Sequence, residues 1–289
     1  MARIGIVGGS GLYALDGLED VREEVVDTPY GRPSDALVRG TLRGVELVFL
    51  PRHGRRHNML PTDVPYRANV WALKNLGCDW LISVSAVGSL REEIHPGHAV
   101  LVDQYIDRTR GNRASTFFGD GVVAHAPFGD PVCATLRGYL RQACQAAGVT
   151  VHDGGTYVCM EGPAFSTRAE SNLYRSWGCS VVGMTALPEA KLAREASMSY
   201  ATLAFATDYD CWHTGHDAVT VDQVVAVLNA NVERARHVLR DAAVRIAAHD
   251  GPAPGHDAMR TSLLTPVDAI EPDARRRLGP ILDALLAGR

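Results

Sequence analysis

The sequence lacks the features that mark membrane, secreted, redox and zinc proteins. No run approaches the roughly 20 apolar residues of a membrane helix. The N-terminus, MARIGIVGGSGLY, has neither the long apolar stretch nor the cleavage site of a signal peptide. The 6 cysteines form no CxxC pair, which argues against a zinc ribbon or a thioredoxin-like site. Scattered, mostly apolar-flanked cysteines are typical of a reducing cytoplasm, where we expect the protein.

Charge of one sign is also scarce. The formal net charge is −4 at pH 7, and acidic and basic residues are mixed without long runs of either. This balance argues against a nucleic-acid or membrane partner. No cluster has the spacing of metal ligands, so we expect no metal and no other cofactor. The chain does have 289 residues, of which 46% are hydrophobic, enough for a sizeable core.

Short apolar runs that end in glycine or proline alternate with segments of helical spacing. The expected strands lie in 2–9, 45–54, 80–90, 98–107, 155–165, the start of 179–196, and 200–210. The expected helices lie in 67–77, 134–148, 168–178, the end of 179–196, and a long segment that opens with a capping box at Thr220. This irregular alternation predicts a three-layer α/β fold with a mixed central β-sheet flanked by helices.

A break in the long helical segment suggests the domain organisation. The stretch HDGPAPGHD (249–257) is rich in glycine and proline and is typical of a linker. We therefore expect a single domain over residues 1–250. Residues 251–289 would be a linker and a tail that can form a short amphipathic helix.

Two of the expected strands end in groups that can bind an anion. In open α/β sheets, ligands gather beyond the carboxyl ends of strands. VGGSGLY (7–13) offers glycine amides and the Ser10 hydroxyl, and PRHGRRH (51–57) offers Arg52 and a further donor in His53. A plain turn and a solvated basic loop are the alternatives. The pattern GxGxxA also allows a dinucleotide site, although the segment after it is too short and acidic for the required helix.

Two further strand ends add hydroxyl and amide donors. SVSAVGSL (83–90) contains Ser85 and the Ala86 amide, and GMTALPEA (183–190) contains Thr185, which could equally be a helix cap. There is no Walker lysine motif. Four strand ends that supply hydroxyls, amides and a guanidinium indicate free phosphate as a reactant rather than a nucleoside triphosphate.

The remaining two motifs are suited to a flat ring. In EGPAFSTRAES (161–171), Phe165 could stack on a flat ring or a sugar face, and Glu161 or Ser166 could bind hydroxyls. The alternative is a proline turn with Phe165 in the core. In FATDYDCW (205–212), Asp208 and Asp210 lie two apart at the end of a strand, so we expect them on one face. Two like charges beside a core are costly unless something uses them.

Together these segments resemble the methylthioadenosine phosphorylase branch of the trimeric purine nucleoside phosphorylase superfamily. The resemblance runs from residue 4 to about residue 245, and its strings occur in the family's order. They are IGIVGGSGLY, VDTPYGRPSDAL, RHGRRH, YRANVWALKNLGC, GSLREEIHPG, DQYIDRT, EGPAFSTRAES, MTALPEAKLAREA and ATDYDCW. Departures from the animal enzymes are serine for threonine at Ser10 and Ser85, Val87 for a cysteine and Ala164 for an arginine.

The resemblance implies a role for each motif. Phosphate would be bound by Ser10, Arg52, His53, Ser85, Ala86 and Thr185. Met184 would flank the ribose, Phe165, Ser166, Asp208 and Asp210 would hold the purine, and Val221 and Val224 would meet the 5′ substituent. The family is a homotrimer. His125 would therefore reach in from a neighbouring subunit, and the tail, near Leu263, could lie on one.

The implied reaction is reversible phosphorolysis of 5′-methylthioadenosine to adenine and 5-methylthioribose 1-phosphate. A departing purine leaves more easily when N7 is protonated, and burial of one carboxyl beside another keeps one of them protonated. We expect Asp208 to be this acid and Asp210 its partner near the amino group. A carboxyl pair suits a 6-aminopurine better than a 6-oxo purine. The alternatives are a broader or 6-oxo purine nucleoside phosphorylase, a specialised 5′-deoxyadenosine-analogue phosphorylase and a nucleotide-dependent oxidoreductase.

Overall fold

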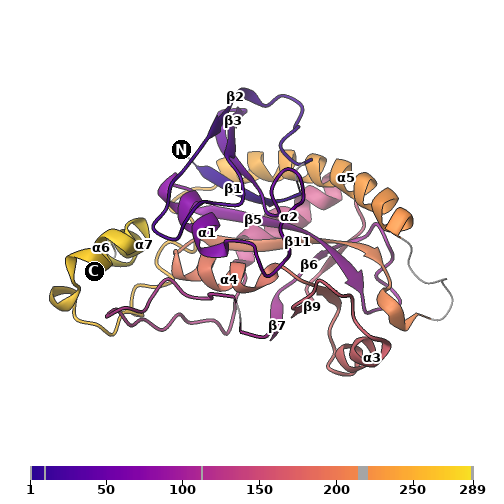
Figure 1. Ribbon diagram of the computed structural model, residues 1–289. Helices are drawn as coiled ribbons and strands as arrows, with labels where there is room; N and C mark the ends of the chain where they lie inside the picture. Colours follow the sequence, from indigo (N-terminus) through magenta and orange to yellow (C-terminus); the bar gives the residue numbers. More distant parts are fainter. Residues whose placement is uncertain (1, 10, 112, 214–220, 288–289) are drawn as a thin grey trace.

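One mixed sheet of 11 strands forms the centre of the molecule, with helices on both of its faces (Figure 1). The computed structural model describes residues 2–9, 11–111, 113–213 and 221–287, and in the last range it describes side chains from residue 227 onward. The strands are β1 (Arg3–Gly8), β2 (Glu19–Glu24), β3 (Leu37–Leu42), β4 (Val45–Pro51), β5 (Trp80–Ser89), β6 (Ala99–Leu101), β7 (Gln104–Arg108), β8 (Val151–Asp153), β9 (Thr156–Met160), β10 (Val181–Gly183) and β11 (Ser199–Asp208). The expected three-layer α/β fold with a mixed sheet is confirmed.

Parallel, almost wholly apolar strands form the middle of the sheet. β1 is parallel to β4 and β5, and β5 is parallel to β11. Nearly every residue of β1 and β11 is buried, as expected for strands covered by helices on both faces. Because these strands run in one direction, the motifs that follow them meet at one edge of the sheet. β10 joins the end of β5 in the antiparallel sense and is itself parallel to β9.

The helices cover the sheet as two separate layers. They are α1 (Tyr66–Asn75), α2 (Ala134–Ala146), α3 (Arg168–Ser176), α4 (Ala186–Glu195), α5 (Val221–Ala247), α6 (Pro272–Leu278) and α7 (Pro280–Leu286), with 3-10 turns η1 (Asp210–Trp212) and η2 (Val267–Ala269). α2 packs on α5 within one apolar cluster, and α1 packs on α4 within another. None of the helices in the described ranges has the length and apolarity needed to cross a membrane.

The tail packs against α1 of the same chain. The indole Nε1 of Trp71 donates to the Leu278 carbonyl at 3.1 Å. Met259, Leu263 and Ile281 are buried in the cluster that contains α1. Residues 251–287 therefore include core side chains as well as a connection. The domain boundary at residue 250 and a contact of the tail with a neighbouring subunit stay predictions.

Some local expectations were wrong. Segment 98–107 forms two strands, β6 and β7, because β6 pairs with β8 and β11 while β7 pairs with β9. β2, β3 and β8 were not among the expected strands. β11 ends at Asp208, and Asp210 has φ 51° at the start of η1, so the two acids do not share one strand face.

Candidate active site

The glycine-rich loop after β1 lies against helix α5. The amide of Leu12 donates to the Gly9 carbonyl at 3.3 Å, and residues 11–13 form a turn. A Cβ on Gly11 would lie 3.0 Å from Cγ1 of Val232 in α5, so the close packing requires glycine. Ser10 lies outside the described residues. Since the described residues 11–18 contain no helix, the dinucleotide alternative lacks the helix it requires.

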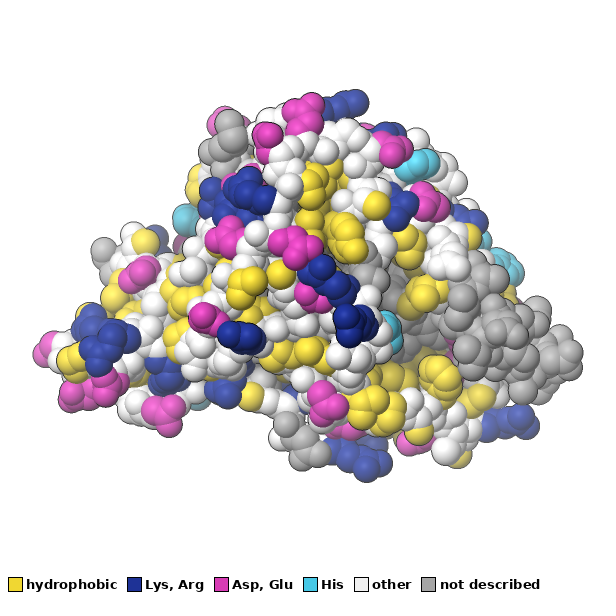
Figure 2. Space-filling view, turned by 45° about the horizontal axis from the view of Figure 1, so that its top comes forward, with side chains coloured by type: hydrophobic (Ala, Val, Ile, Leu, Met, Phe, Trp, Pro, Cys, Tyr) yellow, Lys and Arg dark blue, Asp and Glu magenta, His cyan; other side chains and the backbone are white. Residues whose placement is uncertain are grey.

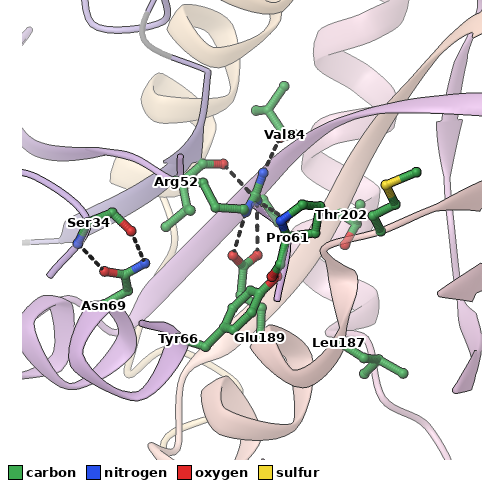
Figure 3. Close-up of polar contacts among 12 residues, drawn as sticks. Ser34, Arg52, Pro61, Tyr66, Asn69, Val84, Leu187, Glu189 and Thr202 are labelled. Atoms are coloured by element: carbon green, nitrogen blue, oxygen red, sulfur yellow. Dashed lines mark hydrogen bonds and ion pairs between the residues drawn. The ribbon is translucent and has the colours of Figure 1, made fainter. Parts of the chain in front are cut away.

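Arg52 is held at the edge where β1 and β4 both end. Its amide donates to the Gly8 carbonyl at 2.9 Å. Its guanidinium forms a two-point ion pair with Glu189 of α4, with Nε–Oε2 at 2.9 Å and Nη2–Oε1 at 3.1 Å (Figure 3). Nη2 also donates to Ser83 Oγ at 2.8 Å, and Nη1 donates to the Val84 carbonyl at 3.1 Å. These contacts fix the plane of the guanidinium.

The charge of Arg52 is permanent although the side chain is only 3% exposed. Burial lowers the pKa of Arg52, but the adjacent Glu189 carboxylate outweighs this effect and leaves the pKa above its ordinary value. Nη1 makes a single hydrogen bond within the described residues, to the Val84 carbonyl, which leaves one of its two hydrogens for a ligand. On the face seen in Figure 2, Lys and Arg side chains are interspersed with Asp and Glu side chains, as the mixed charges along the sequence lead one to expect.

His53 is neutral, and its hydrogen is on the nitrogen that faces the protein. Its Nδ1 lies 2.9 Å from the Met59 carbonyl, which can only accept, so Nδ1 carries the hydrogen. Burial, with a contribution from the charge of Arg52, lowers the pKa of His53 to about 4. Nε2 is then an acceptor in this structure, and the role of His53 at the phosphate stays a prediction. This nitrogen can accept a hydrogen from a protonated phosphate oxygen.

The buried hydroxyl of Ser85, at a neighbouring strand end, remains available for a ligand. Ser85 is buried, and its Oγ has no hydrogen-bond partner within the described part of the chain. Thr185 is at the N-cap position of α4, but its side chain makes no capping hydrogen bond. Ala86 is exposed next to Ser85 on β5. Buried hydroxyls without partners are rare in proteins, and that of Ser85 is explained by a ligand that would complete it.

The residues expected at the ribose and the ring lie on the loops after β9 and β10. Phe165 is 77% exposed, which excludes its alternative role as a core residue. Ser166 is buried, its hydroxyl directed at Met160 Sδ at 3.4 Å and its carbonyl accepting from Cys211 Sγ. Met184 is half-buried next to Gly162, where a Cβ would lie 2.5 Å from the Met184 Sδ.

The structure brings the two acids together but distinguishes their surroundings. Asp208 Oδ2 accepts from Thr207 Oγ1 at 2.7 Å, and Oδ1 accepts from the amide of Asp210 at 2.8 Å. Oδ2 of Asp210 is buried without a hydrogen-bond partner among the described residues. Burial raises the pKa of Asp210, and the nearby charge of Asp208 adds to this effect. The surroundings of Asp210 therefore favour its protonated form, and the assignment of Asp208 as the acid at N7 stays a prediction.

The strand pairing shows how the anion groups and the acids are connected. In the β5–β11 ladder, Gly88 is opposite Asp208, three residues beyond Ser85. A Cβ on Gly88 would lie 3.2 Å from Asp208 Oδ1 and from Asp210 Cβ, so glycine is needed for this approach. β5 thus carries one group next to Arg52 and another next to the acid pair.

Within its own chain, His125 is not brought to this edge. The amide of His125 donates to the Ser262 carbonyl at 2.9 Å, which joins the residue to the tail rather than to the groups above. The side chains of Val221 and Val224 lie outside the described residues. Within the described ranges, no group of three or more His, Cys, Asp and Glu is placed to hold a metal ion.

Comparison with known proteins gives the family. A model of the Phosphorylase superfamily matches residues 3–243. The S-methyl-5′-thioadenosine phosphorylase of Geobacter sulfurreducens is 58% identical over 279 residues, 96% of this chain and 97% of that protein. The corresponding protein of Thermosynechococcus vestitus is 54% identical over 284 residues, 97% of this chain and 98% of its own.

Solved structures agree with the sequence comparison. A methylthioadenosine phosphorylase from an antarctic soil metagenomic library superposes with a TM-score of 0.93 at 47% identity, covering 97% of this chain and 98% of that chain. The methylthioadenosine phosphorylase of Schistosoma mansoni in complex with adenine has a TM-score of 0.82 at 39% identity, covering 86% and 93%. The chain therefore belongs to the phosphorylase superfamily, in its S-methyl-5′-thioadenosine phosphorylase branch.

Proposed function

We propose that the protein is a pentosyltransferase that catalyses the reversible phosphorolysis of 5′-methylthioadenosine to adenine and 5-methylthioribose 1-phosphate. One observation carries the proposal: Arg52 with the unpartnered Ser85 hydroxyl, and the carboxyl pair at Asp208 and Asp210, lie at the same edge of the sheet, joined by β5. A nucleoside hydrolase would not need the groups at Arg52 that can bind phosphate. A phosphate-binding protein would not need the carboxyl pair. The family supports the 5′-methylthio group and the 6-aminopurine as the substrate features.

Phosphate is the nucleophile in this reaction, so its charge has to be held opposite the base. Arg52 Nη1 and the hydroxyls of Ser85 and Thr185 would bind it, together with the Ala86 amide and Ser10 of the glycine-rich loop. Neutral His53 would accept the hydrogen of a protonated phosphate oxygen. The bound phosphate then stabilises the oxocarbenium-like sugar and captures its anomeric carbon. This scheme requires phosphate as a co-substrate and no metal or other cofactor.

The leaving purine gains negative charge, which a proton on N7 would relieve. Burial raises the pKa of Asp210, and the nearby charge of Asp208 adds to this effect, so the surroundings of Asp210 favour its protonated form. Interacting carboxyls titrate as a unit, so this proton is available to the group that faces N7. We assign that place to Asp208 and the exocyclic amino group to Asp210. Phe165 and Ser166 would hold the ring.

The sugar and its 5′ substituent would lie between the base and the phosphate. Met184 would flank the ribose, and the apolar Val221 and Val224 would meet the methylthio group. His125 would reach the site of a neighbouring subunit in a homotrimer, since in its own chain it pairs with the tail. All 6 cysteines are free, in keeping with a cytoplasmic protein. The pathway served would be the salvage of purine and methionine.

Base release measured with and without phosphate tests the proposal. We expect adenine release from 5′-methylthioadenosine that requires phosphate, less from adenosine, and little from inosine or methylthioinosine. Sedimentation would give the mass of a trimer, and treatment with a chelator would leave the rate unchanged. Base release in the absence of phosphate would instead identify a hydrolase, and a preference for inosine would identify a 6-oxo purine phosphorylase.

A further inference from the structure

A buried arginine outside all of the sequence motifs connects the loop after β9, which contains Glu161, to the loop after β10, which contains Met184. Arg113 lies between β7 and α2, and its side chain is 1% exposed. Its Nη1 donates to the carbonyls of Met184 at 2.5 Å and Leu187 at 2.9 Å. Its Nη2 donates to the Glu161 carbonyl at 2.7 Å, and its Nε donates to Glu161 Oε1 at 3.0 Å. One rigid guanidinium thus joins the loops that follow β9 and β10.

The partner of this arginine is fully engaged by protein groups. Besides Arg113, the Glu161 carboxylate accepts from Thr62 Oγ1 and from the amide of Arg110. Burial raises the pKa of Glu161, but the hydrogen bonds from Thr62 and Arg110 outweigh it and keep the pKa below its ordinary value. Glu161 is therefore an ionised anchor for Arg113, and its oxygens are occupied before any substrate binds.

Met184 is held from two sides by this arrangement. Arg113 fixes its carbonyl, and Gly162 leaves room for its thioether, since a Cβ there would lie 2.5 Å from Met184 Sδ. Gly162 has φ 70°, a conformation that other residues adopt only with strain. Thr185 follows Met184 directly and is the N-cap residue of α4, so a shift of Met184 would also shift Thr185.

The base-side end of the same loop is anchored independently. Thr167 and Glu170 form a capping box at the start of α3. The Ser166 carbonyl accepts from Cys211 Sγ at 3.2 Å, in the segment that also carries the acid pair. Removal of Arg113 should therefore displace the ribose wall and leave the groups around the purine in place.

We propose that Arg113 is a positioning residue that sets the ribose wall of the site by holding Met184 against the Glu161 loop. The inference rests on the proposed function, since it takes Met184 as the residue against the sugar. Arg113 does not touch the reacting atoms. It determines how well a purine carrying a ribose binds relative to the free purine.

Calorimetric titration without phosphate separates the two parts of the ligand. Arg113→Lys keeps the charge but cannot reach two loops at once, and Arg113→Met removes the donors. We expect both to weaken binding of 5′-methylthioadenosine at least tenfold while adenine binding changes less than about twofold, since each lost charged hydrogen bond is worth roughly a factor of ten or more. Arg110→Met is the matched control, because that exposed side chain makes no hydrogen bond within the described residues.

Thermal unfolding of each variant shows whether the fold is retained, and Arg113→Lys remains a test if Arg113→Met does not fold. Equal weakening of adenine and nucleoside binding would overturn the proposal, as would unchanged binding of both. The binding comparison does not depend on turnover. A wild-type protein that binds both ligands but releases no adenine with phosphate would refute the proposed function and leave the role of Arg113 standing.

Discussion

The two carboxyl groups at the end of β11 differ although only one residue separates them. Both oxygens of Asp208 accept hydrogen bonds from Thr207 and from the amide of Asp210. Asp210 has left the strand, and its Oδ2 is buried without a partner in the described chain. The backbone turn at Asp210 therefore gives two identical side chains different surroundings: one carboxylate with both oxygens hydrogen-bonded, and one carboxyl whose pKa is raised by burial.

Replacing the first acid should change the choice of base. Asp208→Asn puts an amide donor where a 6-aminopurine needs the carboxyl of the pair. We expect phosphorolysis of adenine nucleosides to fall about 100-fold, within the range for loss of an acid catalyst, and a small gain of activity on inosine. Initial rates on both nucleosides measure this. Unchanged rates on both would remove Asp208 from the site.

Replacing the second acid should change the pH profile. Because burial raises the pKa of Asp210, the protonated pair persists to higher pH than an ordinary aspartate allows, and kcat of the wild-type protein should fall as pH rises through this raised value. Asp210→Asn cannot store the proton, so we expect a lower kcat without this alkaline limb. A mutant that keeps the limb would place the titrating group elsewhere.

The sequence revealed the site residues at the ends of strands, but not the acidic residues that hold the buried arginines in place. Arg52, Ser85 and Thr185 stand in short local motifs at strand ends, and the parallel sheet brings these ends together. Glu189 and Glu161 act through arginines 137 and 48 residues away in the chain. No local pattern reports such a pair, because its geometry exists only once the sheet has formed.

Among the elements, α5 supports the glycine-rich loop as well as the core. Arg236 of α5 donates to the Gly11 carbonyl from Nε at 2.9 Å and from Nη2 at 2.6 Å. Val232, one turn earlier, packs on the same glycine. A charged donor with two bonds to one carbonyl restricts the loop far more than a turn of glycines would alone.

Loss of this contact should weaken phosphate binding selectively. Arg236→Met leaves the Gly11 carbonyl without its donors, and we expect the KM for phosphate to rise about tenfold, as for loss of a charged hydrogen bond. Adenine binding should not change. Arg240→Met, one turn further along α5, is the control because its side chain has no hydrogen bond or ion pair within the described residues. An equal effect of both replacements would exclude a specific role for Arg236.

Elements were predicted from the sequence where a long apolar run or a clear helical spacing marked them, and several were missed where no such pattern stood out. The runs that became β4, β5 and β11 are apolar along most of their length, and α2 has a clear amphipathic spacing. β2 is almost wholly exposed and charged, so no apolar pattern marks it. β6 and β8 have only three residues each, and their pairing with each other depends on the assembled sheet.

At the scale of the whole molecule, a buried acid connects the end of α4 to the segment at Thr116 and Phe117, between β7 and α2. Glu195, the last residue of α4, is 7% exposed. It accepts from Thr116 Oγ1 at 2.7 Å and from the amide of Phe117 at 2.7 Å. Burial raises the pKa of Glu195 to about 7, more than these two hydrogen bonds lower it. The carboxyl therefore titrates near neutral pH in the folded protein.

The stability of the fold should accordingly depend on pH through Glu195. The folded state binds this proton more tightly than the unfolded state, whose pKa is near 4.5, so the free energy of unfolding falls as pH rises from about 4.5 to about 7. The fall is on the order of 3 kcal/mol, since each pH unit between the two values corresponds to about 1.4 kcal/mol. Glu195→Gln keeps an acceptor for the Phe117 amide but does not titrate. Its free energy of unfolding in urea should therefore lack the part of the pH dependence that comes from Glu195.

Glu271→Gln is the control, because Glu271 is exposed and its side chain makes no capping hydrogen bond to α6. This variant should keep the pH dependence of the wild-type protein. Measured at one protein concentration, equal slopes for the wild-type protein and Glu195→Gln would show that the acid is already ionised in the folded state at low pH.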